Sequence, residues 1–537
     1  MSKKNLIIAL FATVILLFTA IFTVYVVWSS YSGQDHSSFI VRENYKIYDD
    51  SHNPRIATAL NELLAVSPNT YQITDDQKEA DLILSINQKN NGNDIFFHEP
   101  YVPVINNQTV LDSVSINSIT NLNINGYQYR NIAIAKSDMD FVTNNYSISS
   151  EKIAIYDDYL HVIDQVNSSA DTIGFIPFSL LSVKVRPLTL DQISPFKEPD
   201  NYPVQIKYSI SGQNVSQFIN TFSDFLPANN ITEVLAVGDI MMGRYVGVKI
   251  NRSQDNTHSF TYVADALAAP DITFAQLETP LAPTEYTSEG MILVAQPETV
   301  AGLEKSGIDL VSLSGNHFGD ALSEGMLSTF ATLDEHGIKY FGAGRDQERA
   351  FQAQIFEKNG TRFGFISFVN IMPDSYGAGP DYPGSAWVDF LSLTDQEKIV
   401  DSLQQAAKNC DVLIAGFHWG TEYTPNPTSV QQQIAHLAID NGADIVIGTH
   451  PHVVQADEIY QNKYIIYSLG NFIMDQMWSE ETQEGVLLYF YVMDDQIISY
   501  DLVPTHVIDY SQVQIISKEE GENILQRIWD ASSDLSK

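Results

Sequence analysis

A repeated pattern between residues 234 and 452 constrains the fold of this chain more than any other feature. Short apolar runs alternate with amphipathic helical segments, and five runs stop at residues able to bind a metal: VLAVGD (234–239), ITFAQLE (272–278), IDLVSLSGNH (308–317), VLIAGFHWG (412–420) and DIVIGTHPH (444–452). This rhythm predicts a layered α/β domain. Because loops past the carboxyl ends of strands gather at one edge of such a sheet, we expect these polar residues to meet there.

The residues at the strand ends form a mixed set of metal ligands. It comprises two carboxylates, one amide and three imidazoles: Asp239, Glu278, Asn316, His418, His450 and His452. This mixture suits Mn²⁺, Fe or Zn²⁺ better than a calcium cage, and it is large enough for one or two ions. Two ions would lower the pKa of an attacking water and stabilise the oxygens in a displacement at phosphorus. We therefore predict a divalent metal site.

The segment GTHPHVVQ, residues 448 to 455, places a histidine on either side of Pro451. Side chains two residues apart in an extended strand point to the same face. If the strand continues through this segment, His450 and His452 face one point.

The charge of the chain limits its partners. The formal net charge is −37 and is spread along 537 residues, which argues against nucleic acid and against docking on anionic lipid through a basic face. An anionic ligand would have to be held locally through a bound cation. The single cysteine, Cys410, excludes an intramolecular disulfide.

The N-terminus carries a membrane signal. Lys3 and Lys4 precede an uncharged run from residue 6 to 28, which is long enough to span a bilayer as a helix. The run exceeds the usual core of a cleaved signal peptide, and no small-residue cleavage site follows it directly. We expect a cytoplasmic segment at 1–5, an uncleaved single-pass anchor at 6–28 and a stalk at 29–37, with the bulk of the chain outside the cell membrane. A cleaved signal is the alternative, and it also predicts export.

Residues 38–227 are predicted to form a separate α/β domain. EPYVPVIN (99–106) and the stretch from 170 to 204, which begins ADTIGFIPFSLL and ends NYPV, resemble phosphate-type solute-binding proteins. The resemblance implies a two-lobed periplasmic-binding-protein-like fold. It leaves two roles open: a degenerate spacer or docking module, and a receptor that senses a small anion.

Six motifs in residues 233–478 resemble the CapA capsule-synthesis family, also called poly-γ-glutamate synthesis proteins. In order they are GDIMMGR (238–244), LET (277–279), GNH (315–317), HWGTEY (418–423), GADIVIGTHPHVVQ (442–455) and YSLGNFIMD (467–475). The family is similar to calcineurin-like metallophosphatases, which implies a four-layer αββα domain over residues 233–510. We expect a tail helix over residues 511–537.

The resemblance also implies roles for single residues. Asp239 and His452 would bind a first ion, Glu278 would bridge two ions, and the second ion would lie among Asn316, His418 and His450. His317 would be the general acid that protonates a leaving group. Arg244 would contact a phosphoryl or carboxylate oxygen, or else form a salt bridge.

One position departs from the phosphatase pattern, whose opening motif is DxH. Here Met241 follows Asp239 two residues on, and a thioether is a poor ligand for these ions. Two functions therefore stay open. The first is a membrane-anchored metal-dependent hydrolase or transferase in the synthesis, release or export of capsule or poly-γ-glutamate. The second is a non-catalytic subunit that retains metal, grips an anionic surface polymer or its precursor, and assembles with membrane synthase subunits.

Overall fold

A computed structural model describes residues 45–86, 94–119, 122–124, 127–146, 148, 150–226, 230–283 and 292–535. The predicted cytoplasmic segment, anchor and stalk, residues 1–37, lie outside the described residues. Within the part of the chain that the structure describes, no helix is long and apolar enough to cross a membrane.

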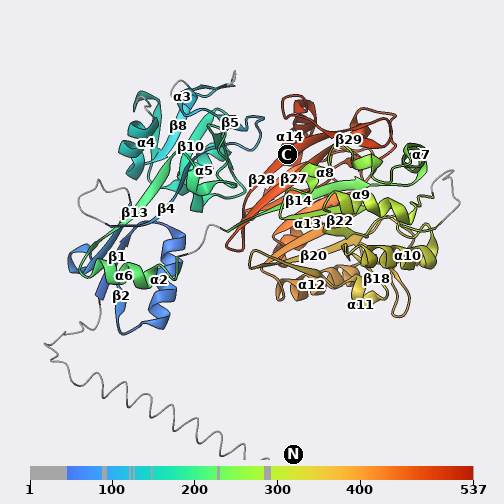
Figure 1. Ribbon diagram of the computed structural model, residues 1–537, viewed down its shortest axis with the longest axis horizontal. Coiled ribbons are helices and arrows are strands. Elements are labelled where there is room, and N and C mark those ends of the chain that lie inside the picture. Colours follow the sequence, from blue (N-terminus) through green and yellow to red (C-terminus); the bar gives the residue numbers. More distant parts are fainter. Residues whose placement is uncertain are drawn as a thin grey trace, which may run out of the picture.

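The N-terminal domain is built on a nine-stranded sheet with two lobes (Figure 1). Its main path runs β2-β1-β3-β13-β4-β10-β8-β9, and β11 pairs with β4. The strands are β1 (Tyr45–Asp50), β2 (Tyr71–Ile73), β3 (Leu82–Ile86), β4 (Asp94–Ile105), β8 (Asn131–Ala135), β9 (Ile153–Tyr156), β10 (Thr172–Pro177), β11 (Arg186–Pro187) and β13 (Gln205–Gly212). The helices are α2 (Pro54–Val66), α3 (Ile116–Ile119), α4 (Met139–Tyr146), α5 (Tyr159–Asn167) and α6 (Val215–Phe222).

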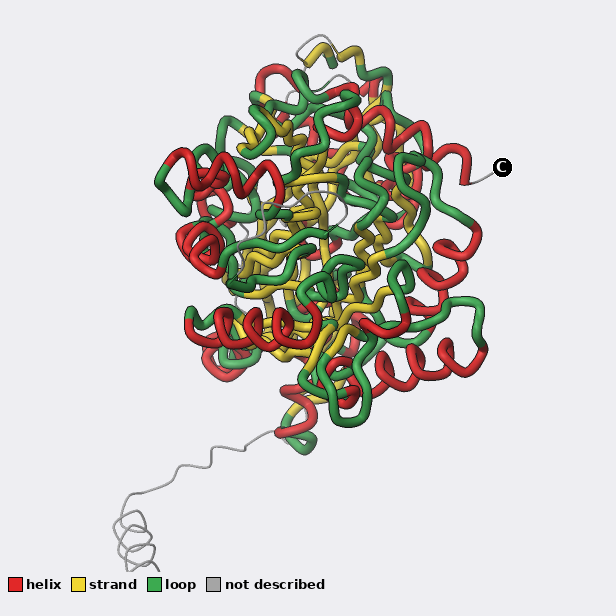
Figure 2. The backbone as a smooth tube through the Cα atoms, turned by 90° about the vertical axis from the view of Figure 1, so that its right-hand side faces the viewer, coloured by secondary structure: helices red, strands yellow, loops and turns green. Residues whose placement is uncertain are grey.

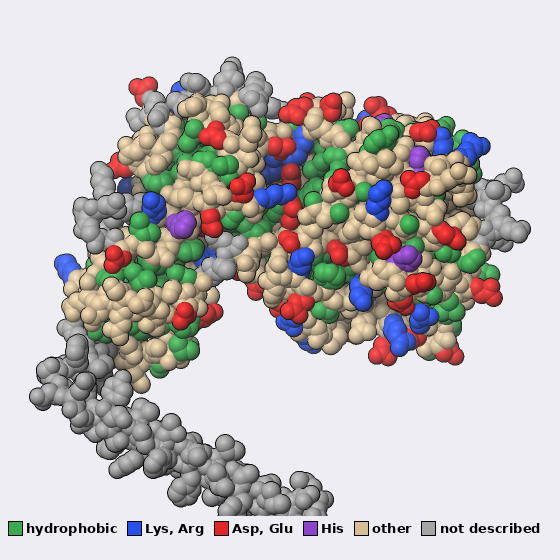
Figure 3. All heavy atoms as spheres, viewed as in Figure 1, with side chains coloured by type: hydrophobic (Ala, Val, Ile, Leu, Met, Phe, Trp, Pro, Cys, Tyr) green, Lys and Arg blue, Asp and Glu red, His purple; other side chains and the backbone are tan. Residues whose placement is uncertain are grey.

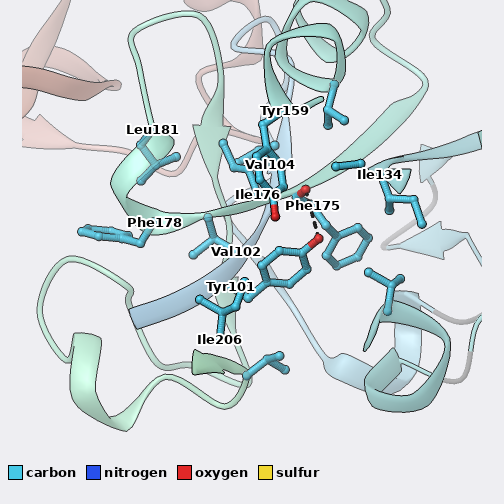
Figure 4. Close-up of a cluster of buried hydrophobic side chains, with 14 of the residues drawn as sticks. Tyr101, Val102, Val104, Ile134, Tyr159, Phe175, Ile176, Phe178, Leu181 and Ile206 are labelled. Carbon is cyan, nitrogen blue, oxygen red and sulfur yellow. Dashed lines mark hydrogen bonds between the residues drawn. The ribbon is translucent and has the colours of Figure 1, made fainter. Parts of the chain in front are cut away.

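Strand β4 holds the two lobes together. Its first half pairs with β13 and its second half with β10, so one long strand belongs to both lobes. The second half carries Tyr101, Val102 and Val104 into a buried core with Phe175 of β10 (Figure 4). Two-residue strand pairs complete the domain: β5 (Ser113–Val114) with β12 (Thr189–Leu190), and β6 (Asn123–Ile124) with β7 (Tyr127–Gln128).

The C-terminal domain contains two large sheets. The first has the order β17-β16-β15-β14-β27-β28-β29, with β26 beside β14. Its strands are β14 (Ile231–Ile240), β15 (Ile272–Leu277), β16 (Leu310–Ser312), β17 (Lys339–Phe341), β26 (Asn471–Ile473), β27 (Glu484–Met493), β28 (Gln496–Ile508) and β29 (Gln512–Ile515). The second sheet consists of β19 (Gln354–Lys358), β20 (Thr361–Val369), β22 (Val412–His418), β23 (Ile445–Thr449), β25 (Lys463–Ile466) and β24 (Asp457–Tyr460), in this order. The short strands β18 (Ala343–Gly344) and β21 (Gly384–Ser385) pair with each other.

Successive side chains of the strands point to opposite faces, so each sheet packs on the other sheet with one face and on helices with the other face. Val234 and Ala236 of β14 belong to a core shared with the second sheet, whereas Leu235 and Val237 belong to a core with outer helices. The helices over the first sheet are α7 (Arg244–Ser253), α8 (Ala264–Leu267), α9 (Val300–Lys305) and α10 (Leu322–Glu335). Those over the second sheet include α11 (Gln347–Ala350), α12 (Leu393–Ala407) and α13 (Ser429–Asp440). Figure 2 shows the strands inside and helices around them. The predicted α/β class is confirmed.

The end of the C-terminal domain differs in detail from the expectation. Residues 464–472 are divided between β25 of the second sheet and β26 of the first. The turn between them contains Gly470 with φ +72°, a conformation that favours glycine. The expected tail helix also begins later: residues 512–515 form β29 on the edge of the first sheet, and α14 (Glu522–Leu535) follows. Ile524, Leu525 and Ile528 bury α14 in the core.

The β27–β28 hairpin joins the two domains (Figure 1). Met493 and Ile498 near its tip belong to the apolar core of the N-terminal domain. The ring of Tyr491 stacks on Phe196 with centroids 3.7 Å apart, and Asp494 accepts a hydrogen bond from Nε of Arg55 at 2.6 Å. Because this contact is both apolar and ionic, it fixes how the domains dock.

Charged residues also meet at this junction (Figure 3). Nζ of Lys518 lies 2.5 Å from Asp112 and also contacts Asp501, and Nη1 of Arg186 lies 2.5 Å from Asp112. Lys518 and Arg186 are buried, with 5% of each residue exposed.

Candidate metal centre

The predicted ligands meet where the carboxyl ends of both sheets of the C-terminal domain adjoin. Asp239 is near the end of β14, Glu278 follows β15, and Asn316 and His317 follow β16 in the first sheet. His418 ends β22, and His450 and His452 follow β23 in the second sheet. Parallel pairing of these strands within each sheet brings their ends to one edge. The structure thus places all six predicted ligands at a common site.

His452 lies between the two carboxylates. Its Nδ1 is 3.8 Å from Oδ2 of Asp239, and its Nε2 is 3.7 Å from Oε1 of Glu278. These separations are too long for hydrogen bonds. The separation between Nε2 and Glu278 matches two ligand atoms that share an ion, since bonds of about 2.0 to 2.2 Å place neighbouring ligands roughly 3 to 4 Å apart.

Asn471 fixes the tautomer of His452. Its Nδ2 donates to the backbone oxygens of Thr482 at 2.9 Å and His452 at 3.3 Å, so its Oδ1 is the acceptor that lies 2.9 Å from Nδ1 of His452. Nδ1 therefore carries the proton, and the lone pair of Nε2 points to Glu278. A bond of this kind is how proteins orient histidines that bind metals.

A second group of predicted ligands lies beside the first. Oδ1 of Asn316 is 2.9 Å from Nε2 of His418, whose Nδ1 is 3.0 Å from the Thr449 hydroxyl. The ring of His450 lies 4.9 Å from that of His418. Burial lowers the pKa of His418 well below its usual range and that of His450 to about 3, with nearby imidazoles adding to the effect. Both rings are therefore neutral, as metal ligands must be.

The two carboxylates provide a test of whether a cation fits. Asp239 and Glu278 are completely buried. Among the described residues, Oδ1 of Asp239, both oxygens of Glu278 and Nδ1 of His450 have no hydrogen-bond partner. Burial raises the pKa of both carboxyls, and for Asp239 the charge of Glu278 adds to it. Because buried unpaired acceptors are costly, this donor set fits one or two divalent cations.

The GTHPHVVQ segment reaches the site by a turn, so the expected extended geometry is wrong. His450 has φ 96° and His452 has φ 58°, both unusual for residues other than glycine. The backbone N–H of His450 donates to Oδ2 of Asp239 at 3.2 Å, and the two rings lie 5.8 Å apart. The turn brings both imidazoles to the site, and it stores backbone strain of the kind found at functional sites.

Gly448 allows β23 to approach the next segment. A Cβ atom there would lie 1.9 Å from the backbone oxygen of Tyr467 and 2.5 Å from Nε1 of Trp419. That indole nitrogen donates to the same Tyr467 oxygen at 3.0 Å. A larger residue would displace the strand that carries His450 and His452.

The structure places Met241 in the apolar core and adds a candidate ligand that the sequence interpretation missed. Met241 is fully buried and belongs to the same apolar core as Phe472. Glu422, in the loop after β22, instead offers a carboxylate oxygen within 4.8 Å of ligand atoms on His450 and His452. Its place four residues after His418, in the HWGTEY motif, was the available signal.

His317 has a partner that was also missed. Its Nδ1 lies 2.8 Å from Oδ2 of Asp320, which accepts the backbone N–H of Leu293 at 2.6 Å. Burial alone would lower the pKa of His317, but the bond to Asp320 and the charges of Glu278 and Asp320 outweigh it and raise the pKa. The spacing of three residues in HFGD was a weak signal.

Arg244 forms the salt bridge that was one of its two predicted roles. Its Nε donates to Oδ2 of Asp475 at 3.2 Å, and its Nη2 contacts Oδ1 of the same carboxylate. The backbone N–H of Tyr245 donates to Asp475 as well. A contact between Arg244 and a substrate oxygen stays a prediction.

Residues 233–476 match the family model described as bacterial capsule synthesis protein PGA_cap. This match covers most of the C-terminal domain. Over 302 residues the chain is 29% identical to the capsule biosynthesis protein CapA of Bacillus anthracis. This alignment covers 55% of this chain and 72% of that protein. It is 26% identical over 313 residues to the PGA biosynthesis protein CapA of Bacillus subtilis, with coverages of 58% and 79%. A probable polyglutamine synthesis accessory protein of Mycobacterium tuberculosis is 27% identical over 278 residues, with coverages of 48% and 73%.

Two solved structures with weaker likeness are described as phosphate-binding transport proteins. A putative phosphate ABC transporter substrate-binding protein with bound phosphate from Clostridium perfringens has a TM-score of 0.29 and 11% identity, covering 34% of this chain and 92% of that one. An ABC-type phosphate transport receptor from Vibrio cholerae has a TM-score of 0.28 and 9% identity, with coverages of 33% and 93%.

Proposed function

We propose that this chain is a membrane-anchored extracytoplasmic protein of capsule or poly-γ-glutamate synthesis, release or export, acting as a metal-dependent hydrolase or transferase with a metallophosphatase-like domain. The PGA_cap match and the CapA relatives support the process. One observation carries the chemistry: among the described residues, Oδ1 of Asp239 and both oxygens of Glu278 are buried without a hydrogen-bond partner, and Oε1 of Glu278 lies 3.7 Å from Nε2 of His452. The anchor is proposed from the uncharged run at residues 6–28.

The six predicted ligands, with Glu422, would hold one or two Mn²⁺, Fe or Zn²⁺ ions. Such ions lower the pKa of a water and neutralise charge that develops on substrate oxygens. They would also let a protein of net charge −37 bind an anionic polymer or its precursor, which its own surface charge repels.

Within this mechanism His317 delivers a proton to the leaving group. Asp320 holds its Nδ1, which leaves Nε2 to face the reacting bond. The raised pKa favours the protonated ring, which is the form that a general acid requires. Arg244, ordered by Asp475, lies near enough to Glu278 to lower the pKa of that carboxyl, and we propose that it orients an anionic substrate group.

A second function has an observation in its favour. Met241 leaves the metal site without the histidine of the phosphatase DxH motif. A site with fewer nitrogen ligands suits a subunit that uses its ions to grip an anionic polymer while membrane synthase subunits perform the chemistry. In that case metal binds but no bond is cleaved.

For the N-terminal domain we propose a docking role rather than a receptor role. The carboxylate of Glu99, fully buried between the lobes, accepts hydrogen bonds from Nδ2 of Asn53 at 2.6 Å, the backbone N–H of Ser179 at 2.7 Å and the hydroxyl of Tyr208 at 2.5 Å. Asn53 caps α2 in one lobe and Ser179 follows β10 in the other. Donors that an anionic ligand would need are thus used by the chain itself. Titration calorimetry with phosphate and with glutamate oligomers should give no heat; saturable heat would restore the receptor role.

The test of the main proposal combines metal content with turnover. Wild-type protein, His317→Ala and His450→Ala are loaded with Mn²⁺, analysed by mass spectrometry for bound metal, and assayed on a generic phosphodiester. We expect both variants to lose turnover, while His317→Ala keeps its metal and His450→Ala loses metal. Metal without turnover in the wild type, across phosphodiester and amide substrates, would favour the assembly role. No bound metal would refute both.

A further inference from the structure

A groove of about 540 Å³ adjoins the candidate metal centre. It lies between the loop after β22, the segment that follows His452, and helix α14. Its apolar lining includes Pro425, Val453, Val454 and Ala531. Since Val453 directly follows His452, a molecule in this groove lies next to the metal ligands.

Tyr423 connects the groove to the candidate metal centre, and the exposed Trp478 packs against it. The ring of Tyr423, which lines the groove, lies nearly parallel to that of His452 with centroids 6.2 Å apart. Trp478 meets Tyr423 edge to face at 5.7 Å, and 61% of Trp478 is exposed. Tyr423 is held in place because its backbone N–H donates to the oxygen of Pro451 at 2.8 Å. A fixed, exposed aromatic pair beside a reactive site is a typical platform for a ligand ring.

The charge on the groove is negative. Glu481 and Asp530 line it as exposed carboxylates, and Asp534 adds a third. Arg527 also lines it, but its guanidinium contacts Glu484 and lies 3.8 Å from Glu480. The groove therefore disfavours a polyanion and favours a ligand with positive charge.

We propose that this groove binds an amine-bearing sugar chain. An apolar sugar face packs on Trp478 and Tyr423, where an ammonium group also gains from the ring faces, and the amines lie near Glu481 and Asp530. In the context of the proposed function, which this inference deepens, the sugar chain is the acceptor or anchoring partner of the polymer. The anionic polymer itself would approach the ions from another side.

The test is titration calorimetry of the intact chain with glucosamine oligomers in the presence of a chelator, so that its outcome does not depend on metal or turnover. We expect saturable binding, weakened roughly tenfold by Trp478→Ala. Asp530→Asn with Glu481→Gln should weaken binding about threefold and remove the preference for glucosamine over N-acetylglucosamine oligomers. Tyr262→Ala, which removes another exposed aromatic ring, should bind as wild type does.

Several outcomes overturn this assignment: no binding of glucosamine oligomers to the wild type, equal affinity in Trp478→Ala, or tighter binding of poly-γ-glutamate that Trp478→Ala weakens. Circular dichroism and melting curves establish that each variant is folded. Loss of metal or turnover in the earlier experiment leaves this result unaffected, so failure of the two proposals is distinguishable.

Discussion

Nε2 of His452 and Oε1 of Glu278 lie 3.7 Å apart in a site where neither oxygen of Glu278 has a hydrogen-bond partner among the described residues. This arrangement is unfavourable without a cation, because a buried carboxylate loses its hydration and gains no donor in return. The metal-free protein therefore carries a local energetic cost that a bound ion removes.

The first prediction concerns Glu278→Gln. Removing the buried charge should raise the free energy of unfolding of the metal-free protein by about 1 to 3 kcal/mol, because the replacement no longer buries an unpaired anion. The same variant should bind less Mn²⁺. Guanidinium unfolding in the presence of a chelator measures the stability, and metal analysis measures Mn²⁺ binding. Higher stability together with weaker metal binding identifies a ligand, because replacing a structural residue would lower the stability.

Glu422→Gln is the matched control for this experiment. Glu422 is partly exposed, so its substitution should leave metal-free stability within about 0.5 kcal/mol of wild type. It should still weaken metal binding if Glu422 is the added ligand. If Glu278→Gln destabilises the metal-free protein instead, the metal interpretation of these oxygens fails.

The second prediction concerns pH. The pKa values of Asp239 and Glu278 are raised in the folded, metal-free protein. The folded state thus holds protons that the unfolded state releases, so these groups make metal-free stability decline as pH rises from the ordinary carboxyl range towards neutrality. A metal ion must displace the same protons, so Mn²⁺ affinity should rise with pH.

Melting temperatures with and without Mn²⁺ check this prediction. The gain from Mn²⁺ should be larger at about pH 8 than at about pH 6, and calorimetry in buffers of different ionisation enthalpy should detect proton release. Equal gains at both pH values, with no proton release, would show that the carboxylates are already ionised.

The third prediction separates Asp320 from the residues that are proposed to bind metal. Asp320→Asn should retain metal but lower the pKa of His317, because it removes the bond and charge that raise it. If His317 acts as the acid, the alkaline limb of the rate profile should move to lower pH. A profile of turnover against pH, with metal content measured in parallel, checks this; an unchanged alkaline limb would assign His317 a structural role.

The sequence predicts the location of those site residues whose position depends only on the order of the strands. Asp239, Glu278 and His418 end or follow strands in parallel sheets, and parallel strands present their carboxyl ends at one edge. The pattern of apolar runs therefore predicts that these residues meet, even though up to 179 positions separate them along the chain.

The details that the sequence did not predict depend on long-range contacts. The positive φ values of His450 and His452 are held by hydrogen bonds to Asp239 and Asn471, far away in sequence. Glu422 reaches the site because its loop is tied to Pro451 through Tyr423. No local propensity encodes such contacts, so the sequence pattern predicts a strand where the structure has a turn, and it does not indicate Glu422 as a candidate ligand.

The last prediction concerns the junction of the two domains. Lys518→Met should reduce the free energy of unfolding by about 2 to 3 kcal/mol, because it leaves Asp112 and Asp501 near each other with Arg186 as their remaining cation. The effect is smaller than for a fully buried pair, since Asp112 is half exposed. Guanidinium unfolding measures it, with Lys398→Met as control: that side chain is 46% exposed, and its partner Asp395 still accepts the backbone N–H of Asp389, so its loss should cost less than about 1 kcal/mol. Equal effects of the two variants would mean that the charged cluster does not stabilise the docked domains.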